Sequence, residues 1–226
     1  MNCNYCSVAI DGPSGAGKST IARSVAEKLG FLYVDTGAIY RTVGLAAYRA
    51  GLPLGDLQGV TALLETLKIQ LIYQNGVQKM LLHGEDVSEA IRQPLISKYA
   101  SDVSAMPPVR AYLLELQRNL ARTQNVIMDG RDIGTVVLPD AGLKIFLTAS
   151  AQERAARRFR ELQEKGVDCT FETVLQDMIE RDRNDSNRAA APLKAAEDAV
   201  LIDTTGYTLE ESIDRIYKTV QERFGL

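Results

Sequence analysis

Short apolar runs alternate with longer amphipathic segments along this chain. Each short run is continuously apolar, a pattern typical of strands that are buried on both faces of a parallel sheet. The runs predict five strands, at Ser7–Ile10, Phe31–Val34, Val126–Met128, Leu143–Leu147 and Val200–Ile202.

Helical spacing marks the segments between these strands. Ile21, Val25 and Leu29 form one face of a first helix, and Gly30 is placed to end it. The same amphipathic pattern predicts four later helices, at Val109–Arg122, Ala151–Lys165, Phe171–Arg181 and Leu209–Phe224. Alternating strands and helices predict an α/β fold of three layers, in which helices cover both sides of a parallel five-stranded sheet.

One segment departs from this alternation. Between Lys68 and Glu85, apolar residues alternate with polar ones up to Asn75-Gly76, and a second run follows at Val77–Leu82. Asn and Gly both tolerate the positive φ angles of a tight hairpin turn, so the pattern predicts a small antiparallel insertion.

Length, charge and cysteine content limit the class of protein. The chain of 226 residues suits one principal domain, and its net charge of −3 argues against a general nucleic-acid or membrane-surface binder. It contains no apolar stretch near the roughly 20 residues that span a bilayer, and residues 1–6 do not resemble a secretion signal, so we expect a cytoplasmic protein. Cys3, Cys6 and Cys169 are expected to be reduced thiols, because no further ligands complete a zinc site with the Cys3/Cys6 pair.

The first strand is followed directly by a glycine-rich loop. Gly12, Gly17, Lys18 and Ser19 match the spacing G-x-x-x-x-G-K-[ST] of a phosphate-binding loop, between a strand and a helix as that motif requires. Backbone N–H groups would surround the phosphates, Lys18 would reach the β- and γ-phosphates, and the Ser19 hydroxyl would bind Mg²⁺. The predicted ATP-binding residues are Gly12, Pro13, Ser14, Gly15, Ala16, Gly17, Lys18, Ser19 and Thr20. The alternative is a tight strand-to-helix turn with an incidental lysine.

Two polar segments lie at the carboxyl ends of other predicted strands, where open parallel sheets bind their ligands. One is Asp35–Arg41 and the other is Asp129–Thr135. In proteins with a phosphate-binding loop, a second motif, the Walker B motif, is an apolar strand that ends in Asp. Asp129 ends such a strand, so it is expected to hold Mg²⁺ through water. Taken singly, either segment could also be a polar turn.

Arginines gather in the third candidate region. Arg154, Arg157, Arg158 and Arg160 lie on one predicted helix, and Arg181, Arg183 and Arg188 follow in a polar run. The spacing of 154, 157 and 158 predicts a shared helical face, and the region could form a mobile cover that stabilises charge on a transferring phosphoryl group. A solvent-exposed charged surface is the alternative.

With these motifs the chain resembles the bacterial cytidylate kinase family over nearly its whole length. The resemblance rests on Gly12–Thr20, Asp35–Arg41, the hairpin at Asn75-Gly76, Ser101, Arg110, Asp129–Thr135 and Arg181–Leu193. It implies a core (1–40, 120–150 and 190–226), a monophosphate-binding subdomain (about 41–119) and a lid (about 151–189). It also implies phosphoryl transfer from ATP to CMP or dCMP. Ser19 stands where many members carry Gly, and the amino-terminal Cys pair is no part of the family pattern.

The resemblance also implies roles for individual residues. Arg41 and Arg131 would clamp the acceptor phosphate, and Asp185 with Arg181 would reach the sugar hydroxyls. Cytosine offers a donor at N4 and acceptors at N3 and O2. Asp132 and Ser101 suit the donor, whereas Arg110 and Arg188 suit the acceptors. The expected CMP-binding set is Thr36, Tyr40, Arg41, Ser101, Arg110, Arg131, Asp132, Arg181, Asp185 and Arg188, and the expected catalytic set is Lys18, Arg131, Arg157 and Arg158.

Two other functions stay open at this point. One is a phosphate-loop kinase for a different small acceptor, in which Asp35 or Asp132 would act as base for a hydroxyl. The other is a nucleotide-dependent switch, against which the absence of an Asn-Lys-x-Asp segment weighs. A monophosphate is already an anionic nucleophile, so His83 is not expected to be catalytic. We expect small-molecule partners and a monomer.

Overall fold

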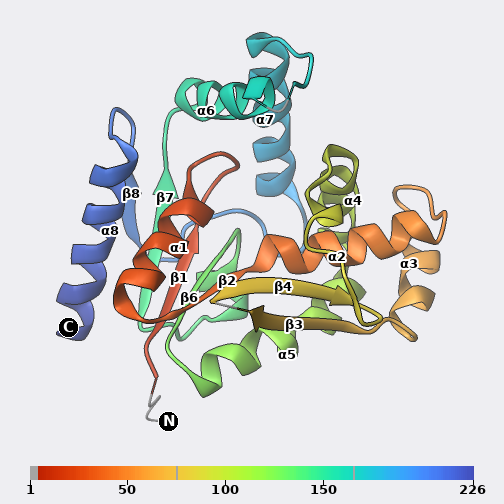
Figure 1. Cartoon of the computed structure of the whole chain (residues 1–226), viewed down its shortest axis with the longest axis horizontal. Helices are drawn as coiled ribbons and strands as arrows, with labels where there is room; N and C mark the ends of the chain where they lie inside the picture. Colours follow the sequence, from red (N-terminus) through yellow and green to blue (C-terminus); the bar gives the residue numbers. More distant parts are fainter. Residues whose placement is uncertain (1–4, 75, 165) are drawn as a thin grey trace. The chain divides into compact units, whose positions relative to one another are not determined.

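The computed structural model describes residues 5–74, 76–164 and 166–226. By its internal contacts the chain divides into two compact units (Figure 1). The first unit comprises Met1–Tyr33 and Ala121–Leu226, and the second comprises Val34–Leu120. The boundaries expected for core, subdomain and lid stay a prediction.

A five-stranded parallel sheet forms the centre of the first unit, in the order β2-β6-β1-β7-β8. Its strands are β1 (Ser7–Asp11), β2 (Leu32–Asp35), β6 (Val126–Gly130), β7 (Leu143–Thr148) and β8 (Val200–Asp203). All five predicted strands are therefore confirmed. The structure extends several of them at the carboxyl end, because backbone pairing continues through Asp11 and Gly130. Val8, Ala9 and Ile10 are all fully buried, so β1 is covered on both faces.

The helices of this unit are α1 (Lys18–Leu29), α6 (Ala151–Glu164), α7 (Phe171–Asn187) and α8 (Leu209–Phe224). Figure 1 shows α1 and α8 side by side, and residues of both join the core cluster around β1. Gly30 ends α1 in the left-handed conformation, as predicted. A reciprocal capping box between Thr208 and Glu211 begins α8.

The structure corrects one helix boundary in the arginine-rich region. Helix α7 continues to Asn187, although the sequence pattern predicts its end at Arg181. The last turns carry polar residues alone, so apolar spacing gives no signal there, while no Gly or Pro interrupts the helix before Arg188. Helix α6 is described as far as Glu164, and its predicted last residue, Lys165, lies outside the described residues.

The second unit contains the predicted hairpin. β3 (Ile69–Gln74) and β4 (Val77–Leu82) pair antiparallel, and a short β5 (Glu85–Asp86) extends the sheet. Asn75 lies outside the described residues, and Gly76 has the positive φ that the turn requires. The helical elements are α2 (Thr36–Arg49), α3 (Leu57–Leu64), a 3₁₀ turn (Ala90–Arg92), α4 (Pro94–Ser104) and α5 (Pro107–Thr123), whose end lies in the first unit.

The segment Asp35–Arg41 is not a turn. Asp35 ends β2 and caps α2, because its Oδ1 accepts a hydrogen bond of 2.8 Å from the Ala38 amide. Thr36 to Arg41 therefore form the first turns of a helix that the apolar pattern does not predict. Helices α3 and α4 are likewise absent from the sequence-based expectation, whereas α5 was predicted two residues shorter at its start and one at its end.

The described part of the chain has no membrane-spanning helix and no disulfide. None of its helices combines the length and the apolar character needed to cross a membrane. Cys6 and Cys169, the two cysteines within that part, are thiols rather than disulfides.

The phosphate loop approaches the sheet very closely at Gly12, and a substitution there tests this contact. Its φ is +150°, and a Cβ at this position would lie 1.9 Å from the Leu147 carbonyl oxygen. We expect Gly12→Ala to lower the free energy of unfolding by about 3 kcal/mol, because a backbone atom cannot rotate away. Gly30→Ala is the matched control, since Gly30 also has positive φ but an added Cβ would meet nothing within 4 Å; it should cost about 1 kcal/mol. Equal costs in urea unfolding would contradict this interpretation.

Candidate active site

The phosphate loop holds its lysine close to its own backbone. The Lys18 side chain is 5% exposed, and its Nζ donates a hydrogen bond of 2.7 Å to the Pro13 carbonyl oxygen. Burial, followed by the positive charge of Arg131, lowers the pKa of Lys18 well below its ordinary value. Negative charge beside the ammonium raises that pKa, so an entering triphosphate would stabilise the protonated lysine.

Ser19 and Asp129 meet as the two motifs predict. The Ser19 hydroxyl, in the first turn of α1, donates a hydrogen bond of 2.8 Å to Asp129 Oδ2 at the end of β6. The Tyr33 hydroxyl donates to the other oxygen, Oδ1, over 2.9 Å. Hydroxyl and carboxylate oxygens are the ligands that Mg²⁺ prefers, so this pair fits that ion. Sequence analysis did not indicate Tyr33, which reaches Asp129 from the neighbouring strand.

Four of the predicted acceptor residues in the first unit form a network of alternating charge. Arg131 Nε donates to Asp185 Oδ2 over 3.0 Å, and Arg188 Nη2 lies 3.5 Å from Asp132 Oδ1. Arg188 Nη1 lies 4.0 Å from Asp185 Oδ1 and so joins the two pairs. Asp185 and Arg188 are adjacent to each other because α7 extends to Asn187. Each buried charge therefore has a partner of opposite sign.

The predicted residues of the second unit gather around α2. Asp35 Oδ2 lies 3.7 Å from Arg41 Nη1 and 3.4 Å from Arg92 Nη2. Among the described residues, the buried Nη1 of Arg41 finds no hydrogen-bond acceptor, so this donor is available for an anion. The guanidinium of Arg110 lies over the ring of Tyr40, 5.7 Å from its centre. Sequence analysis did not indicate Arg92.

The predicted CMP-binding residues are divided between the units. Thr36, Tyr40, Arg41, Ser101 and Arg110 belong to the second, and Arg131, Asp132, Arg181, Asp185 and Arg188 belong to the first. Thr36 and Tyr40 lie on α2, Ser101 on α4, Arg110 on α5 and Arg181 on α7.

Helices α6 and α7 contact the phosphate loop through a buried ion pair. Arg154 Nη1 donates to Asp182 Oδ2 over 2.6 Å and to the Ser14 carbonyl oxygen over 2.8 Å. The Ser14 amide in turn donates to Asp182 Oδ1 over 3.1 Å. Both polar groups of the Ser14 backbone are thus held by one pair. Asp182 was missed, because only a helix that continues past Arg181 brings it to this position.

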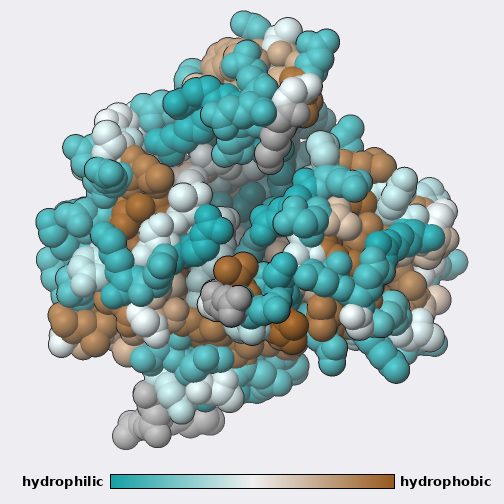
Figure 2. Space-filling view, in the orientation of Figure 1, coloured by the Kyte–Doolittle hydropathy of each residue, from teal (hydrophilic) through white to brown (hydrophobic). Residues whose placement is uncertain are grey.

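The other arginines of α6 have separate partners. Arg157 pairs with Glu153 over 3.3 Å, and a Cβ built on Gly17 would lie 3.7 Å from its Nη1. Arg158 pairs with the exposed Glu161 over 3.0 Å. Arg154, Arg157 and Arg158 all lie on the continuous helix α6 at the spacing of one helical face, and Arg154 is buried whereas Arg158 is partly exposed. Figure 2 shows mostly hydrophilic residues over the surface of α6 and α7.

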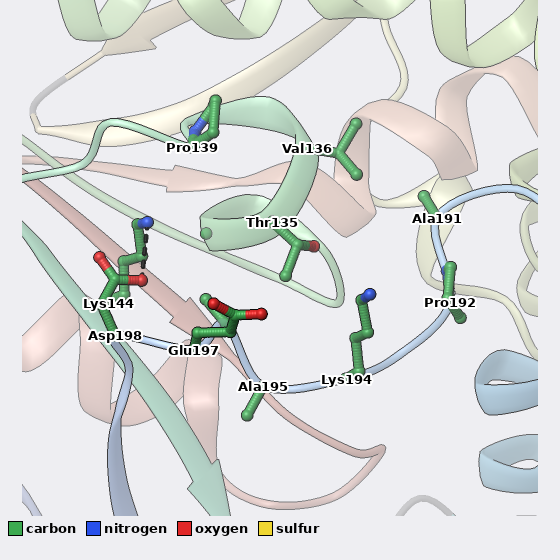
Figure 3. Close-up of a pocket in the computed structure, with 12 residues that line it drawn as sticks. Thr135, Val136, Pro139, Lys144, Ala191, Pro192, Lys194, Ala195, Glu197 and Asp198 are labelled. Carbon is green, nitrogen blue, oxygen red and sulfur yellow. Dashed lines mark hydrogen bonds and ion pairs between the residues drawn. The ribbon is translucent and has the colours of Figure 1, made fainter.

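A cavity of about 440 Å³ lies elsewhere in the first unit (Figure 3). Its walls come from the turn that includes Thr135 and Val136, from Lys144, and from the segment 191–198. Lys144 is paired with Asp198 over 2.9 Å, which Figure 3 marks with a dashed line. Within the described chain, no predicted ATP- or CMP-binding residue lines this cavity, so it is not the candidate site.

Comparison with known proteins bears directly on this arrangement. A family model described as cytidylate kinase matches residues 8–222. The chain belongs to the cytidylate kinase family. A cytidylate kinase of Carboxydothermus hydrogenoformans is 50% identical over 213 residues, which are 94% of this chain and 96% of that protein. A cytidylate kinase of Caldicellulosiruptor saccharolyticus is 49% identical over 218 residues, 96% of each chain.

Solved structures support the fold of this family member. An uncharacterized protein from Eubacterium ventriosum matches with a TM-score of 0.53 and 13% identity, over 96% of this chain and 98% of that one. At this identity the likeness concerns the fold alone.

The contact of Asp182 with the phosphate loop can be tested by Asp182→Ala. Loss of the carboxylate removes the acceptor of the Ser14 amide and leaves Arg154 without its anion, so we expect the KM for ATP to rise about 10-fold. Steady-state kinetics with varied ATP measures this. Asp177→Ala, an exposed aspartate on the same helix, is the control and should leave the KM unchanged. An unaltered KM for ATP in Asp182→Ala would contradict a role for the pair.

Proposed function

We propose that this chain transfers the γ-phosphoryl group of ATP to CMP or dCMP, giving ADP and CDP or dCDP, in pyrimidine nucleotide metabolism. Two observations carry the proposal. The chain belongs to the cytidylate kinase family, and its phosphate loop has the Ser19–Asp129 hydrogen bond that suits a nucleoside triphosphate with Mg²⁺.

The donor half of the site is assigned to the loop Gly12–Thr20. Its amides and Lys18 bind the phosphates, with the carbonyl of Pro13 giving way to phosphate oxygens as the partner of Nζ. Ser19 would hold Mg²⁺ through its hydroxyl, and Asp129 would hold it through water. When bound, the ion neutralises charge on the phosphates. Arg131, Arg157 and Arg158 supply positive charge to the transferring group, and the closeness of Arg157 to Gly17 supports its part.

The acceptor half is assigned by charge and by the hydrogen-bonding edge of cytosine. Arg41 and Arg131 bind the phosphate, and the buried Nη1 of Arg41, which makes no hydrogen bond to another described residue, supports this role. Asp132 and Ser101 accept from N4, while Arg110 and Arg188 donate to N3 and O2. Arg181 and Asp185 bind the sugar, and Thr36 and Tyr40 complete the set. Uracil presents an acceptor where cytosine presents N4, so the carboxylate of Asp132 selects against it.

The phosphate of CMP is itself the nucleophile, so the reaction needs no strong general base. The residues instead position two anions and offset the charge that is shared in the transition state. The monomeric state and the cytoplasmic location stay predictions.

A panel of nucleoside monophosphates tests the proposed function. With ATP and Mg²⁺ in a coupled assay of ADP release, we expect CMP and dCMP to be phosphorylated at least about 10-fold faster than UMP and AMP, because one mismatched hydrogen bond at the base costs about 1–3 kcal/mol. Similar rates for all four would contradict the assignment, as would turnover of ATP that is independent of any monophosphate.

The role of Lys18 is tested by Lys18→Met. Removing the ammonium from the phosphates should lower kcat at least about 100-fold while the protein stays folded, since a methionine fits the same buried space. Circular dichroism and kcat are the measurements. Lys28→Met makes the same change at an exposed position of α1 and should retain full activity. A normal kcat in Lys18→Met would show that the loop has been assigned wrongly.

A further inference from the structure

Asp11 is a buried carboxylate that the proposed mechanism does not use. It ends β1 immediately before the phosphate loop, and its side chain is almost wholly inaccessible. Oδ1 accepts a hydrogen bond of 2.8 Å from the amide of Ile133, and Oδ2 accepts one of 2.8 Å from the amide of Gly134. Each carboxylate oxygen thus accepts a hydrogen bond from one of two consecutive backbone amides, and both amides lie more than 100 residues from Asp11 in the sequence.

These two amides begin a single π-helical turn, Ile133–Val137. The later amides of the turn are bonded within it, since Val136 and Val137 donate to the Asp132 carbonyl oxygen over 2.9 and 3.2 Å. The first amides of any helical turn have no such carbonyl before them. A side chain must supply the acceptor, and the residue that usually does so is the one directly before the turn.

That residue is Asp132, and it does not cap the turn. Within the described structure, its side chain accepts no capping hydrogen bond from the amides that follow it. Its Oδ1 instead lies 3.5 Å from Nη2 of Arg188. Because Asp11 caps the turn from β1, the carboxylate of Asp132 pairs with Arg188 instead of with the backbone amides of the turn.

We propose that Asp11 is a positioning residue for the acceptor nucleotide: by capping the turn Ile133–Val137 in place of Asp132, it keeps the Asp132 carboxylate directed toward the base. This inference rests on the proposed function of Asp132. Without Asp11, the carboxylate placed to satisfy the two amides is that of Asp132, which directly precedes the turn and would then turn away from Arg188 and from the cytosine.

The protonation of Asp11 supports this argument. Burial raises its pKa from 3.8 to about 6, against the lowering effect of the two amides. Charged groups also lie on the elements around β1: Asp129 on β6, Asp132 before the turn, Lys18 on α1 and Lys144 on β7. Of these, Asp132 raises the pKa of Asp11 and Lys18 lowers it. Because the folded pKa exceeds the ordinary value, ionised Asp11 disfavours the fold above pH 6. A carboxylate that costs stability at neutral pH is expected where function requires it.

Asp11→Asn tests the proposal. The amide side chain keeps one acceptor but presents an NH₂ group to the second backbone N–H, so Asp132 becomes the better cap. We expect the KM for CMP to rise about 10-fold and the KM for ATP to change less than about 2-fold. Asp56→Asn is the matched control, since Asp56 also accepts a backbone amide at a helix start, from Gly59 over 2.8 Å, and should leave both KM values unchanged.

A second measurement uses the unaltered protein and does not depend on how the variant folds. In ¹⁵N-resolved NMR spectra, the amide shifts of Ile133 and Gly134 should titrate with a midpoint near pH 6, the pKa of Asp11. The KM for CMP should rise as the pH falls through this range, because protonated Asp11 loses an acceptor oxygen. The phosphate of CMP also changes its protonation near pH 6, and this affects the KM of both proteins. Only the difference in the pH dependence of the KM between the unaltered protein and Asp11→Asn is therefore assigned to Asp11.

Three outcomes would overturn the inference. One is an unchanged KM for CMP in Asp11→Asn, and another is an equal rise in both KM values with a lower melting temperature, which would indicate a purely structural role. The third is the absence of titration near pH 6 at both amides. None of these concerns the identity of the substrate. If the unaltered protein does not phosphorylate CMP, the proposed function fails instead, and the NMR titration still reports whether Asp11 caps the turn.

Discussion

The parallel pairing of β1 on both sides is the constraint on which the site depends. Its register sets Ile10 against Asp129 and Asp11 against Gly130, so the two carboxylates lie one residue out of step at the carboxyl ends of adjacent strands. On the other side, β7 brings the Leu147 carbonyl so close that only glycine fits at position 12. The phosphate loop must therefore turn at once after β1. This turn sets the position of Lys18 and Ser19 at the start of α1.

Buried charge is the second common feature of the site. Lys18, Asp11, Asp132, Asp185 and Arg154 are all nearly inaccessible, and each is held by backbone groups or by a charge of opposite sign. Burial pushes the pKa of Lys18 down and that of Asp11 up, which means that both ionised forms are costly in this environment. Dipoles and charges that are fixed before substrate binds need no reorganisation during phosphoryl transfer.

Prediction from the sequence succeeded where apolar spacing or glycine chemistry dominates. The strands of the central sheet, the start of the hairpin and the end of α1 at Gly30 all follow from local pattern. It failed for α2, whose small residues and internal glycines weaken the helical signal, and for the polar end of α7. These failures matter for the site, because α7 carries Asp182 and Asp185 and α2 carries Arg41.

The sequence by itself determined the glycine-rich phosphate-loop motif, the order of the five central strands and the end of α1 at Gly30, since each depends on neighbours within a few positions. Only the tertiary structure decided which carboxylate caps the turn at Ile133, that Arg154 is buried against Asp182, and that Tyr33 reaches Asp129. These contacts join residues from about 30 to more than 120 positions apart. Their geometry follows from how strands and helices pack, which no local pattern of residues encodes.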